Sequence, residues 1–274
     1  MHKVEPLTWL EISRAALTHN VGEFRKLVGE ERLLAAVVKA NAYGHGMREV
    51  SRIFLQAGVD WLAVHSLDEG LALRAAELDC PIIVLGYVPL VDLREAVERE
   101  LRITVYNRET VEKLGTITDH LGKKSYLHLK LETGTQRQGF LEEDIPGFLG
   151  ILKSHGNLVL EGLSTHFANI EDTTDHSYAK GQLGEFIRLS ERIEENGISV
   201  PIRHTACRAA ALLFPETYFQ MVRLGIGLYG LWPSKETYVS GLEKGDGMPD
   251  LRPVLTWKTR IAQVKTIPSG SYVG

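Results

Sequence analysis

The sequence predicts an α/β protein: a (β/α)8 barrel followed by the start of an antiparallel β domain. Short apolar runs alternate with longer segments of helical periodicity, and the runs are continuously hydrophobic, as in strands buried on both faces of a parallel sheet. This repeated order requires right-handed crossovers, and eight such units form a barrel of roughly 250 residues. An open doubly wound sheet is the structural alternative. No Gly-x-Gly-x-x-Gly motif follows the first strand, so the barrel is favoured.

The individual elements follow from local patterns. The strand-like runs lie at residues 33–38, 61–64, 81–85, 101–106, 126–131 and 158–166. A 3.6-residue apolar period predicts helices at residues 47–58, 66–78, 108–122 and 178–197. Ser66 and Glu69 have the spacing of a capping box at a helix start. Gly58 and Gly122 stand where helices should end.

The character of the chain changes after residue 232. Residues 233–253 are rich in proline, glycine and charge, which is typical of a linker. Residues 254–267 alternate apolar and polar positions, like the opening strand of an antiparallel domain. We therefore expect a barrel domain over residues 1–235, and a linker with the first strand or strands of a truncated β domain over residues 236–274.

Composition excludes several classes of protein. A hydrophobic fraction of 44% and a charged fraction of 24% are those of an ordinary globular protein. The net charge of −4 provides no basic field for nucleic acid or an anionic membrane. The two cysteines cannot form a disulfide framework, and neither a signal peptide nor a membrane-spanning run is visible. We expect a soluble cytoplasmic protein with no metal site.

The sharpest local signal is AAVVKANAYGHG at residues 35–46. Lys39 stands where a buried strand gives way to a loop, which in a barrel is the end where chemistry takes place. Partial desolvation there would lower the pKa of the lysine and make its amine a nucleophile suited to a Schiff base. From spacing alone, a strand-end lysine that extends to solvent explains the position equally well.

This segment resembles the pyridoxal-phosphate motif of alanine racemases, in which the lysine forms the internal aldimine. Four further segments match that family in the same order, and the similarity extends over essentially the whole chain. They are LKLETGTQRQGF (129–140), STHFAN (164–169), RHTACRAAALLFPE (203–216) and MVRLGIGLYGLWPS (221–234). The resemblance implies a barrel that binds pyridoxal 5'-phosphate, with Lys39 as the residue that carries it.

The resemblance also implies which residues hold the cofactor phosphate. Tyr43 is similar to a residue whose hydroxyl bonds the phosphate, although an amphipathic aromatic in a wall would show the same pattern. Gly225 and Ile226 resemble backbone N–H donors to the phosphate, and glycine permits the close approach of such donors. Turn geometry would explain the glycines without the resemblance.

Two further residues resemble contacts to the cofactor ring. Arg223 is similar to the arginine that pairs with the pyridine nitrogen, which stays unprotonated because a guanidinium gives up no proton readily. The weakened electron sink disfavours a long-lived quinonoid and steers the reaction away from transamination. His166 resembles the histidine that packs beside the ring. A surface ion pair for Arg223 and a structural role for His166 are the plainer explanations.

A second basic pair matches the family in the segment 129–140. Arg137 resembles the arginine that bonds the phenolic oxygen and supports the position of the partner subunit's catalytic tyrosine. Lys130 resembles a lysine that is N-carboxylated in many of these enzymes, which would give Arg137 an anionic neighbour. An unmodified Lys130 is equally compatible with the sequence.

The chain departs from the family pattern at a few positions. Arg208 replaces a serine that helps to bind the phosphate, so it either bonds the phosphate itself or obstructs the site. Thr135 stands where methionine is common and Glu132 where aspartate is frequent, and we expect both to be tolerated. The larger departure is the shortened β domain, which in the family supplies the second catalytic base, a tyrosine, across a dimer interface.

The resemblance implies an alanine racemase that makes D-alanine for peptidoglycan, works on free alanine and forms a homodimer. We expect catalysis and dimerisation to be impaired in this chain because the second base is missing. A racemase of serine or another small amino acid, a non-catalytic pyridoxal-phosphate carrier and a cofactor-free structural barrel are the alternatives. The strand expected at residues 254–267 and the racemase-like LETGTQRQGF favour the racemase, since a carrier has no use for a partial β domain.

Overall fold

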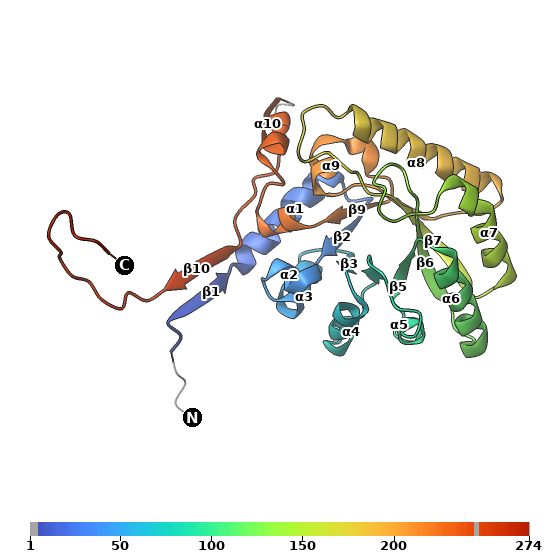
Figure 1. Ribbon diagram of the computed structural model, residues 1–274, viewed down its shortest axis with the longest axis horizontal. Helices are drawn as coiled ribbons and strands as arrows, with labels where there is room; N and C mark the ends of the chain where they lie inside the picture. Colours follow the sequence, from blue (N-terminus) through green and yellow to red (C-terminus); the bar gives the residue numbers. More distant parts are fainter. Residues whose placement is uncertain (1–4, 244–246, 274) are drawn as a thin grey trace.

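The computed structural model describes residues 5–243 and 247–273, and within them eight parallel strands form a near-closed barrel (Figure 1). Their order around the barrel is β8-β7-β6-β5-β4-β3-β2-β9. The gap between β8 and β9 is bridged by backbone hydrogen bonds of 3.2 Å from Gln220 to Arg203 and 3.1 Å from Arg223 to Ala206. The strands are β2 (Leu33–Val37), β3 (Trp61–Val64), β4 (Ile82–Val84), β5 (Arg102–Val105), β6 (Ser125–Lys130), β7 (Leu158–Ser164), β8 (Ile202–His204) and β9 (Met221–Leu224).

Helices follow the strands around the outside, as the alternating pattern predicts (Figure 1). Their apolar faces pack on the strands and form the main hydrophobic core. The helices are α1 (Arg14–Val28), α2 (Lys39–Tyr43), α3 (Met47–Gln56), α4 (Leu67–Ala75), α5 (Leu93–Glu98), α6 (Arg108–Leu121), α7 (Ile145–Ser154), α8 (Ser177–Glu195), α9 (Arg208–Leu213) and α10 (Lys235–Glu243). Short 3-10 turns lie at η1 (Glu142–Asp144), η2 (Pro215–Thr217) and η3 (Ile226–Tyr229).

The helix start and stop signals in the sequence are confirmed. The Ser66 hydroxyl accepts a 3.4 Å hydrogen bond from the Glu69 N–H, and the Glu69 carboxylate accepts one of 3.3 Å from the Ser66 N–H. Gly58 and Gly122 follow their helices with φ of 97° and 62°, a conformation that costs glycine little. These local choices therefore agree with the global fold.

The inside of the barrel is filled by a small cluster of side chains and, above it, by buried polar groups. The apolar members pack as a second core, separate from the larger one under the helices. They are Ala35, Val37, Trp61, Ala63, Ile83, Ile202 and Met221. The polar members, His128, Lys130, His204 and Arg223, are each at most 8% exposed. The barrel is thus a packed interior whose polar groups need partners.

Strand β1 (Thr8–Ile12) lies outside the barrel and pairs antiparallel with β10 (Leu255–Thr259). The pair projects from the barrel as a two-stranded ribbon (Figure 1). The strand expected at 254–267 is shorter than predicted, because its partner offers only five residues for pairing. Residues 233–253, expected as a linker, contain α10. Residues 244–246 of that stretch, and residue 274, lie outside the described part of the chain. The domain boundary at residue 235 stays a prediction.

No helix in the described ranges is both long and apolar enough to cross a membrane.

Candidate active site

The residues singled out from the sequence gather at the C-terminal ends of the barrel strands. Lys39 begins the segment after β2, Lys130 ends β6, and His166 follows β7. Arg208 begins α9 after β8, and Arg223 lies within β9. Because all of these strands are parallel, their C-terminal ends meet on one face of the barrel, which is where barrel enzymes place their chemistry.

The backbone after Lys39 is left-handed. Ala40, Asn41, Ala42 and Tyr43 have φ between 52° and 55°, so the five-residue α2 is not an ordinary right-handed helix. This conformation costs L-residues roughly 1–2 kcal/mol each. Strain of this kind persists only where the surroundings over-determine it, and it clusters at functional sites. Half-buried Lys39 is therefore presented by a strained turn rather than by a relaxed loop.

Two side chains hold this turn. The Glu69 carboxylate accepts a 2.6 Å hydrogen bond from the Ala40 N–H and another of 2.8 Å from the His65 N–H. The Asn41 side chain accepts a 2.9 Å hydrogen bond from the Met47 N–H at the start of α3. Glu69 thus caps α4 and also binds the Lys39 turn to the next βα unit. The spacing of Ser66 and Glu69 in the sequence predicts the first of these roles but not the second.

His166 stands among cations. Burial, followed by the positive charges of Arg223, Arg137, Lys130 and Lys39, lowers the pKa of His166 to about 3. The imidazole is therefore neutral at physiological pH. The four cations lie close enough to act on one ring, so the structure brings these sequence-predicted residues together.

Lys130 is a buried amine in the same cluster. Burial, then the charges of Arg137 and Arg223, lower its pKa to about 8, while Glu132 acts in the opposite direction. Glu132 itself shapes the loop that carries Arg137: its carboxylate accepts hydrogen bonds of 2.6 Å from the Gly134 N–H and 3.3 Å from the Arg137 N–H. Glu132 thus holds the loop through its carboxylate.

Arg223 is buried, with only 8% of its surface exposed, and not part of a surface ion pair. Its Nη1 donates to the Nδ1 of His204 and, at 2.6 Å, to the His204 carbonyl oxygen. Its Nη2 donates to the carbonyl oxygens of Thr165 at 2.9 Å and Thr205 at 3.3 Å. Burial lowers the pKa of Arg223 to about 10, so the guanidinium remains a rigidly held cation.

A second group of residues surrounds Tyr43. A Cβ added at Gly225 would lie 2.7 Å from the Tyr43 hydroxyl, so only glycine leaves the space in front of that hydroxyl open. Ile226 follows as the first residue of η3. Burial raises the pKa of Tyr43, and the charges of Arg208 and Glu171 also act on it. The hydroxyl therefore stays a neutral donor.

Arg208, the departure from the family pattern, faces Glu171. Its Nη2 lies 3.3 Å from the Glu171 carboxylate and donates a 3.5 Å hydrogen bond to the Pro233 carbonyl oxygen. Its Nε is buried and has no hydrogen-bond partner among the described residues. A buried guanidinium N–H without an acceptor is costly, which makes this position suited to an anion.

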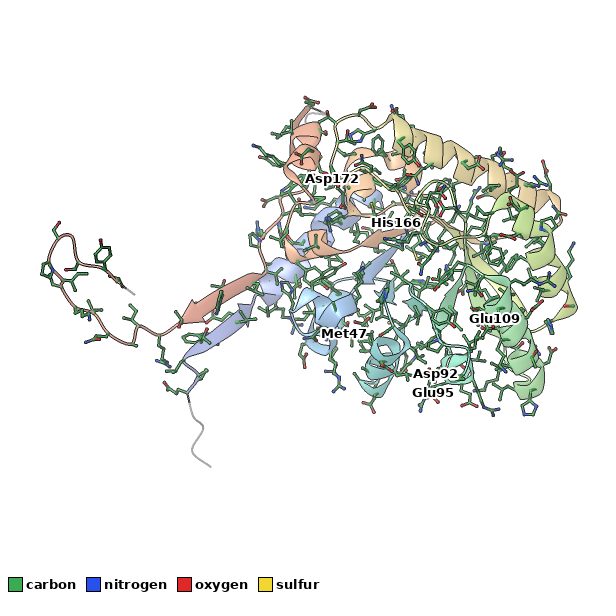
Figure 2. The ribbon with its side chains drawn as sticks, viewed as in Figure 1. Met47, Asp92, Glu95, Glu109, His166 and Asp172 are labelled. Atoms are coloured by element: carbon green, nitrogen blue, oxygen red, sulfur yellow. The ribbon has the colours of Figure 1, made fainter. Side chains whose placement is uncertain are left out.

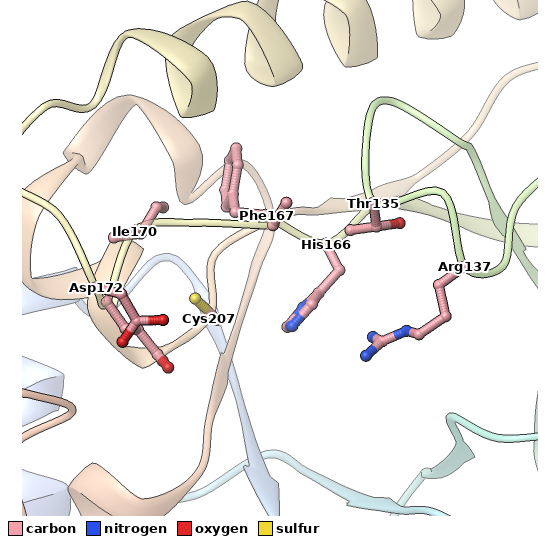
Figure 3. A pocket seen from close by; sticks show the side chains of 9 residues that line it. Thr135, Arg137, His166, Phe167, Ile170, Asp172 and Cys207 are labelled. Carbon is pink, nitrogen blue, oxygen red and sulfur yellow. The ribbon is translucent and has the colours of Figure 1, made fainter.

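A cavity of about 220 Å³ opens beside Arg137, His166 and Glu171. The side chains of Arg137 and His166 point into it from neighbouring loops, and Cys207 lines it from the turn before α9 (Figure 3). His166 and Asp172 both belong to the loop between β7 and α8 (Figure 2). The lining residues are Thr135, Arg137, His166, Phe167, Ala168, Ile170, Glu171, Asp172 and Cys207.

Sequence reasoning missed several residues of the site. His128 and Glu161 lie in the runs predicted as strands at residues 126–131 and 158–166, and His204 lies in the racemase-like segment 203–216 without matching a functional residue named there. Polar residues within continuously apolar strand runs are the signal that would have found them. Glu171 carries no local signal, because only the fold brings it to Arg208.

The family model for the N-terminal domain of alanine racemase matches residues 12–233. The chain belongs to the alanine racemase family. An alanine racemase of Desulforamulus reducens is 41% identical over 271 residues, which cover 98% of this chain and 70% of that protein. One of Methanococcus maripaludis is 38% identical, covering 97% of this chain and 69% of that protein.

Solved structures of the family have the same fold. The alanine racemase of Clostridium difficile 630 in complex with cycloserine superposes with a TM-score of 0.89 at 32% identity, covering 96% of this chain and 71% of that one. The enzyme of Bacillus anthracis with bound L-Ala-P gives a TM-score of 0.87 at 34% identity, covering 99% and 69%. The chain therefore spans about 70% of the length of these alanine racemases.

Proposed function

We propose that this protein is a pyridoxal-phosphate-dependent alanine racemase that interconverts L- and D-alanine and supplies D-alanine for peptidoglycan. The observation that carries the proposal is the convergence of Lys39, Arg137, His166 and Arg223 in a chain whose relatives are named alanine racemases. These residues match the family motif one by one, and the charges of Lys39, Arg137 and Arg223 act on the buried imidazole of His166.

The residues around Tyr43 fit the phosphate of pyridoxal phosphate. The buried Nε of Arg208 has no partner among the described residues, and Gly225 leaves room in front of the Tyr43 hydroxyl. A dianionic phosphate would satisfy such donors. We therefore assign Tyr43, Arg208, Gly225 and Ile226 to the phosphate end. We assign Arg223 to the ring nitrogen.

Once bound, pyridoxal phosphate supplies a conjugated ring that accepts electrons and so makes the α-proton of an attached amino acid acidic. The chain supplies the rest. The Lys39 amine holds the cofactor and moves a proton at one face of the alanine Cα. Arg223 would hold a fixed positive charge beside the ring nitrogen, and this charge would keep the ring nitrogen unprotonated. Neutral His166 packs beside the ring, and Arg137 donates to the phenolic oxygen.

Lys130 gives Arg137 an anionic neighbour when it is N-carboxylated. Only an unprotonated amine reacts with carbon dioxide, and a pKa of about 8 leaves an appreciable share of Lys130 in that form at neutral pH. The carbamate would also replace one buried positive charge by a negative one among Arg137 and Arg223. We propose that Lys130 is the modified residue.

Racemisation needs a base on each face of Cα, because a single base returns the proton to the face it left. We assign Lys39 to one face. The resemblance assigns the other face to a tyrosine of the family's β domain, beyond the segments that match here. We therefore expect a polypeptide of these 274 residues to racemise alanine at least about 1000-fold more slowly than intact family members and to dimerise weakly.

The decisive experiment locates the cofactor. Purified protein is loaded with pyridoxal phosphate, treated with borohydride and digested, and the labelled peptide is identified by mass spectrometry. We expect the label on Lys39 and its loss in Lys39→Ala, with exposed Lys26→Ala as the matched control. Label on another lysine would contradict the assignment. Exchange of the α-hydrogen of D-alanine with deuterated water separates a racemase from a cofactor carrier, which binds without exchange.

A further inference from the structure

A chain of buried polar side chains crosses the inside of the barrel from Arg223. Arg223 bonds the Nδ1 of His204, and the Nε2 of His204 lies 2.7 Å from the Nδ1 of His128. The Nε2 of His128 lies 3.2 Å from the carboxylate of Glu161. Arg102 closes the far end with a 3.2 Å bond from its Nε to the same carboxylate oxygen. Five barrel strands or strand ends are thus linked through side chains alone.

The backbone is adapted to this chain. The β6–β7 register shifts between Leu127 and His128, so that Leu127 pairs with Leu160 and His128 with Gly162. Glu161 is the extra residue of the resulting bulge, and bulges commonly re-aim a side chain. A Cβ at residue 162 would overlap the His128 ring, so glycine is required beside it. Both features favour the contact between His128 and Glu161.

The hydrogen bonds of this chain run in one direction. A guanidinium only donates, so the Nδ1 of His204 must accept from Arg223. A neutral His204 then carries its proton on Nε2 and donates to the Nδ1 of His128. His128 in turn carries its proton on Nε2 and donates to Glu161, which as a carboxylate only accepts. Arginine at one end and carboxylate at the other thus leave one arrangement of protons.

Charge and burial agree with neutral rings. Both imidazoles are at most 1% exposed. Burial, then the charge of Arg223 and His128, lower the pKa of His204, and burial is also the main cause of the lowered pKa of His128. Burial opposes ionisation of Glu161, but the His128 bond and the Arg102 charge outweigh it and lower its pKa. A protonated His204 would turn an N–H toward Arg223.

We propose that His204, His128 and Glu161 are positioning residues that form a directional hydrogen-bond chain and hold Arg223 as a donor of fixed orientation. The claim about Arg223 and the cofactor ring rests on the proposed function; the direction of the chain does not. The plane of the Arg223 guanidinium is fixed because its Nη1 donates to the Nδ1 of His204. That nitrogen can only accept, since the proton of His204 is on Nε2 and is donated to His128. Weakening the acceptor at Glu161 loosens each link back to Arg223.

The first test needs neither cofactor nor variant. Protein labelled with 15N-histidine is examined by long-range proton–nitrogen NMR, which distinguishes the two neutral tautomers from imidazolium. For His204 and His128 we expect a proton on Nε2 and none on Nδ1, from pH 8 down to about 6. A proton on Nδ1 of His204, or an imidazolium at either position, would overturn the proposal.

The second test is Glu161→Gln, which keeps the shape and weakens the acceptor. Its matched control is Asp119→Asn, which removes a carboxylate that lies 2.7 Å from the Nδ1 of partly exposed His155. In Glu161→Gln we expect NMR to show both neutral tautomers of His128 instead of the Nε2-protonated form alone. We also expect the affinity for pyridoxal phosphate to fall by roughly 10-fold, the lower end of the effect of losing a group that orients a direct ligand. The control should change neither.

The 15N NMR signal of the ring nitrogen of labelled pyridoxal phosphate reports whether that nitrogen is protonated. This signal would not change if Glu161 only stabilised the fold. We expect it unprotonated in the wild type and in Asp119→Asn, and shifted toward the protonated form in Glu161→Gln. An unchanged ring signal in Glu161→Gln, or an equal effect of both variants, would refute the positioning role. If no protein binds the cofactor, the proposed function fails, and the histidine tautomers still decide the direction of the chain.

Discussion

Replacing Arg208 with serine tests how this chain binds phosphate. The guanidinium of Arg208 pairs with Glu171, its charge acts on the Tyr43 hydroxyl, and its buried Nε lacks a hydrogen-bond partner among the described residues. If Arg208 bonds the phosphate, Arg208→Ser removes at least one charge-assisted hydrogen bond. If Arg208 instead obstructs the site, the serine variant restores the space that the family pattern provides. The two cases predict opposite changes in affinity.

We expect Arg208→Ser to weaken binding of pyridoxal phosphate. A hydrogen bond to a charged group contributes about 1–3 kcal/mol, which corresponds to a roughly 5- to 150-fold increase in Kd. Glu171→Gln should act in the opposite direction by a smaller factor. Its carboxylate lies 3.3 Å from the Arg208 Nη2 and competes with phosphate for the same donor.

Equilibrium titration followed by absorbance measures both variants. Pyridoxal without its phosphate is the matched control ligand, and its affinity should not depend on Arg208. Inorganic phosphate should compete with the cofactor in the wild type more strongly than in Arg208→Ser. Equal or tighter binding of pyridoxal phosphate by Arg208→Ser would show that Arg208 obstructs the cavity and would refute the reasoning.

Three further predictions follow from the cluster and from the Lys39 turn. Because burial lowers the pKa of unmodified Lys130 from 10.5 to about 8, its ammonium is costly at neutral pH, although solvent screens part of that cost. Compared with wild-type protein kept free of carbon dioxide, in which Lys130 is not carboxylated, Lys130→Met should therefore raise the free energy of unfolding in urea by about 1–3 kcal/mol, and a loss of stability would contradict this. The unfolded chain protonates His166 near pH 6.5 but the folded chain only near pH 3, so stability should fall as the pH drops through this window, by up to about 1.4 kcal/mol per pH unit. We expect the free energy of unfolding of His166→Phe, measured in urea between pH 7 and 4, to change less per pH unit than that of the wild type. An unchanged pH dependence would exclude His166 as the cause of the loss of stability. Ser66→Ala should lower the free energy of unfolding in urea by about 1 kcal/mol and leave cofactor binding unchanged. Glu69→Ala should also weaken cofactor binding, because it releases the Lys39 turn. Equal effects of the two variants on binding would mean that Glu69 acts only as a helix cap.

The sequence by itself determined the barrel and the position of its lysine. Strand and helix periodicities are local, and continuous apolar runs such as PIIVL need no knowledge of distant partners to be recognised. The capping box of Ser66 and Glu69 and the strand-end position of Lys39 follow from neighbours a few residues away. The ends of the six predicted strand runs agree with the structure to within a few residues, because glycines and polar residues flank the apolar runs.

Only the tertiary structure decided how the buried polar groups are paired. Glu69 accepts the Ala40 N–H from a segment 29 residues away, and His204 meets His128 across 76 residues. The left-handed turn after Lys39 is unfavourable for the residues that adopt it, so local propensity predicts against it. Such contacts exist because closing the barrel buries these groups together, and each then needs a partner that the local sequence does not contain.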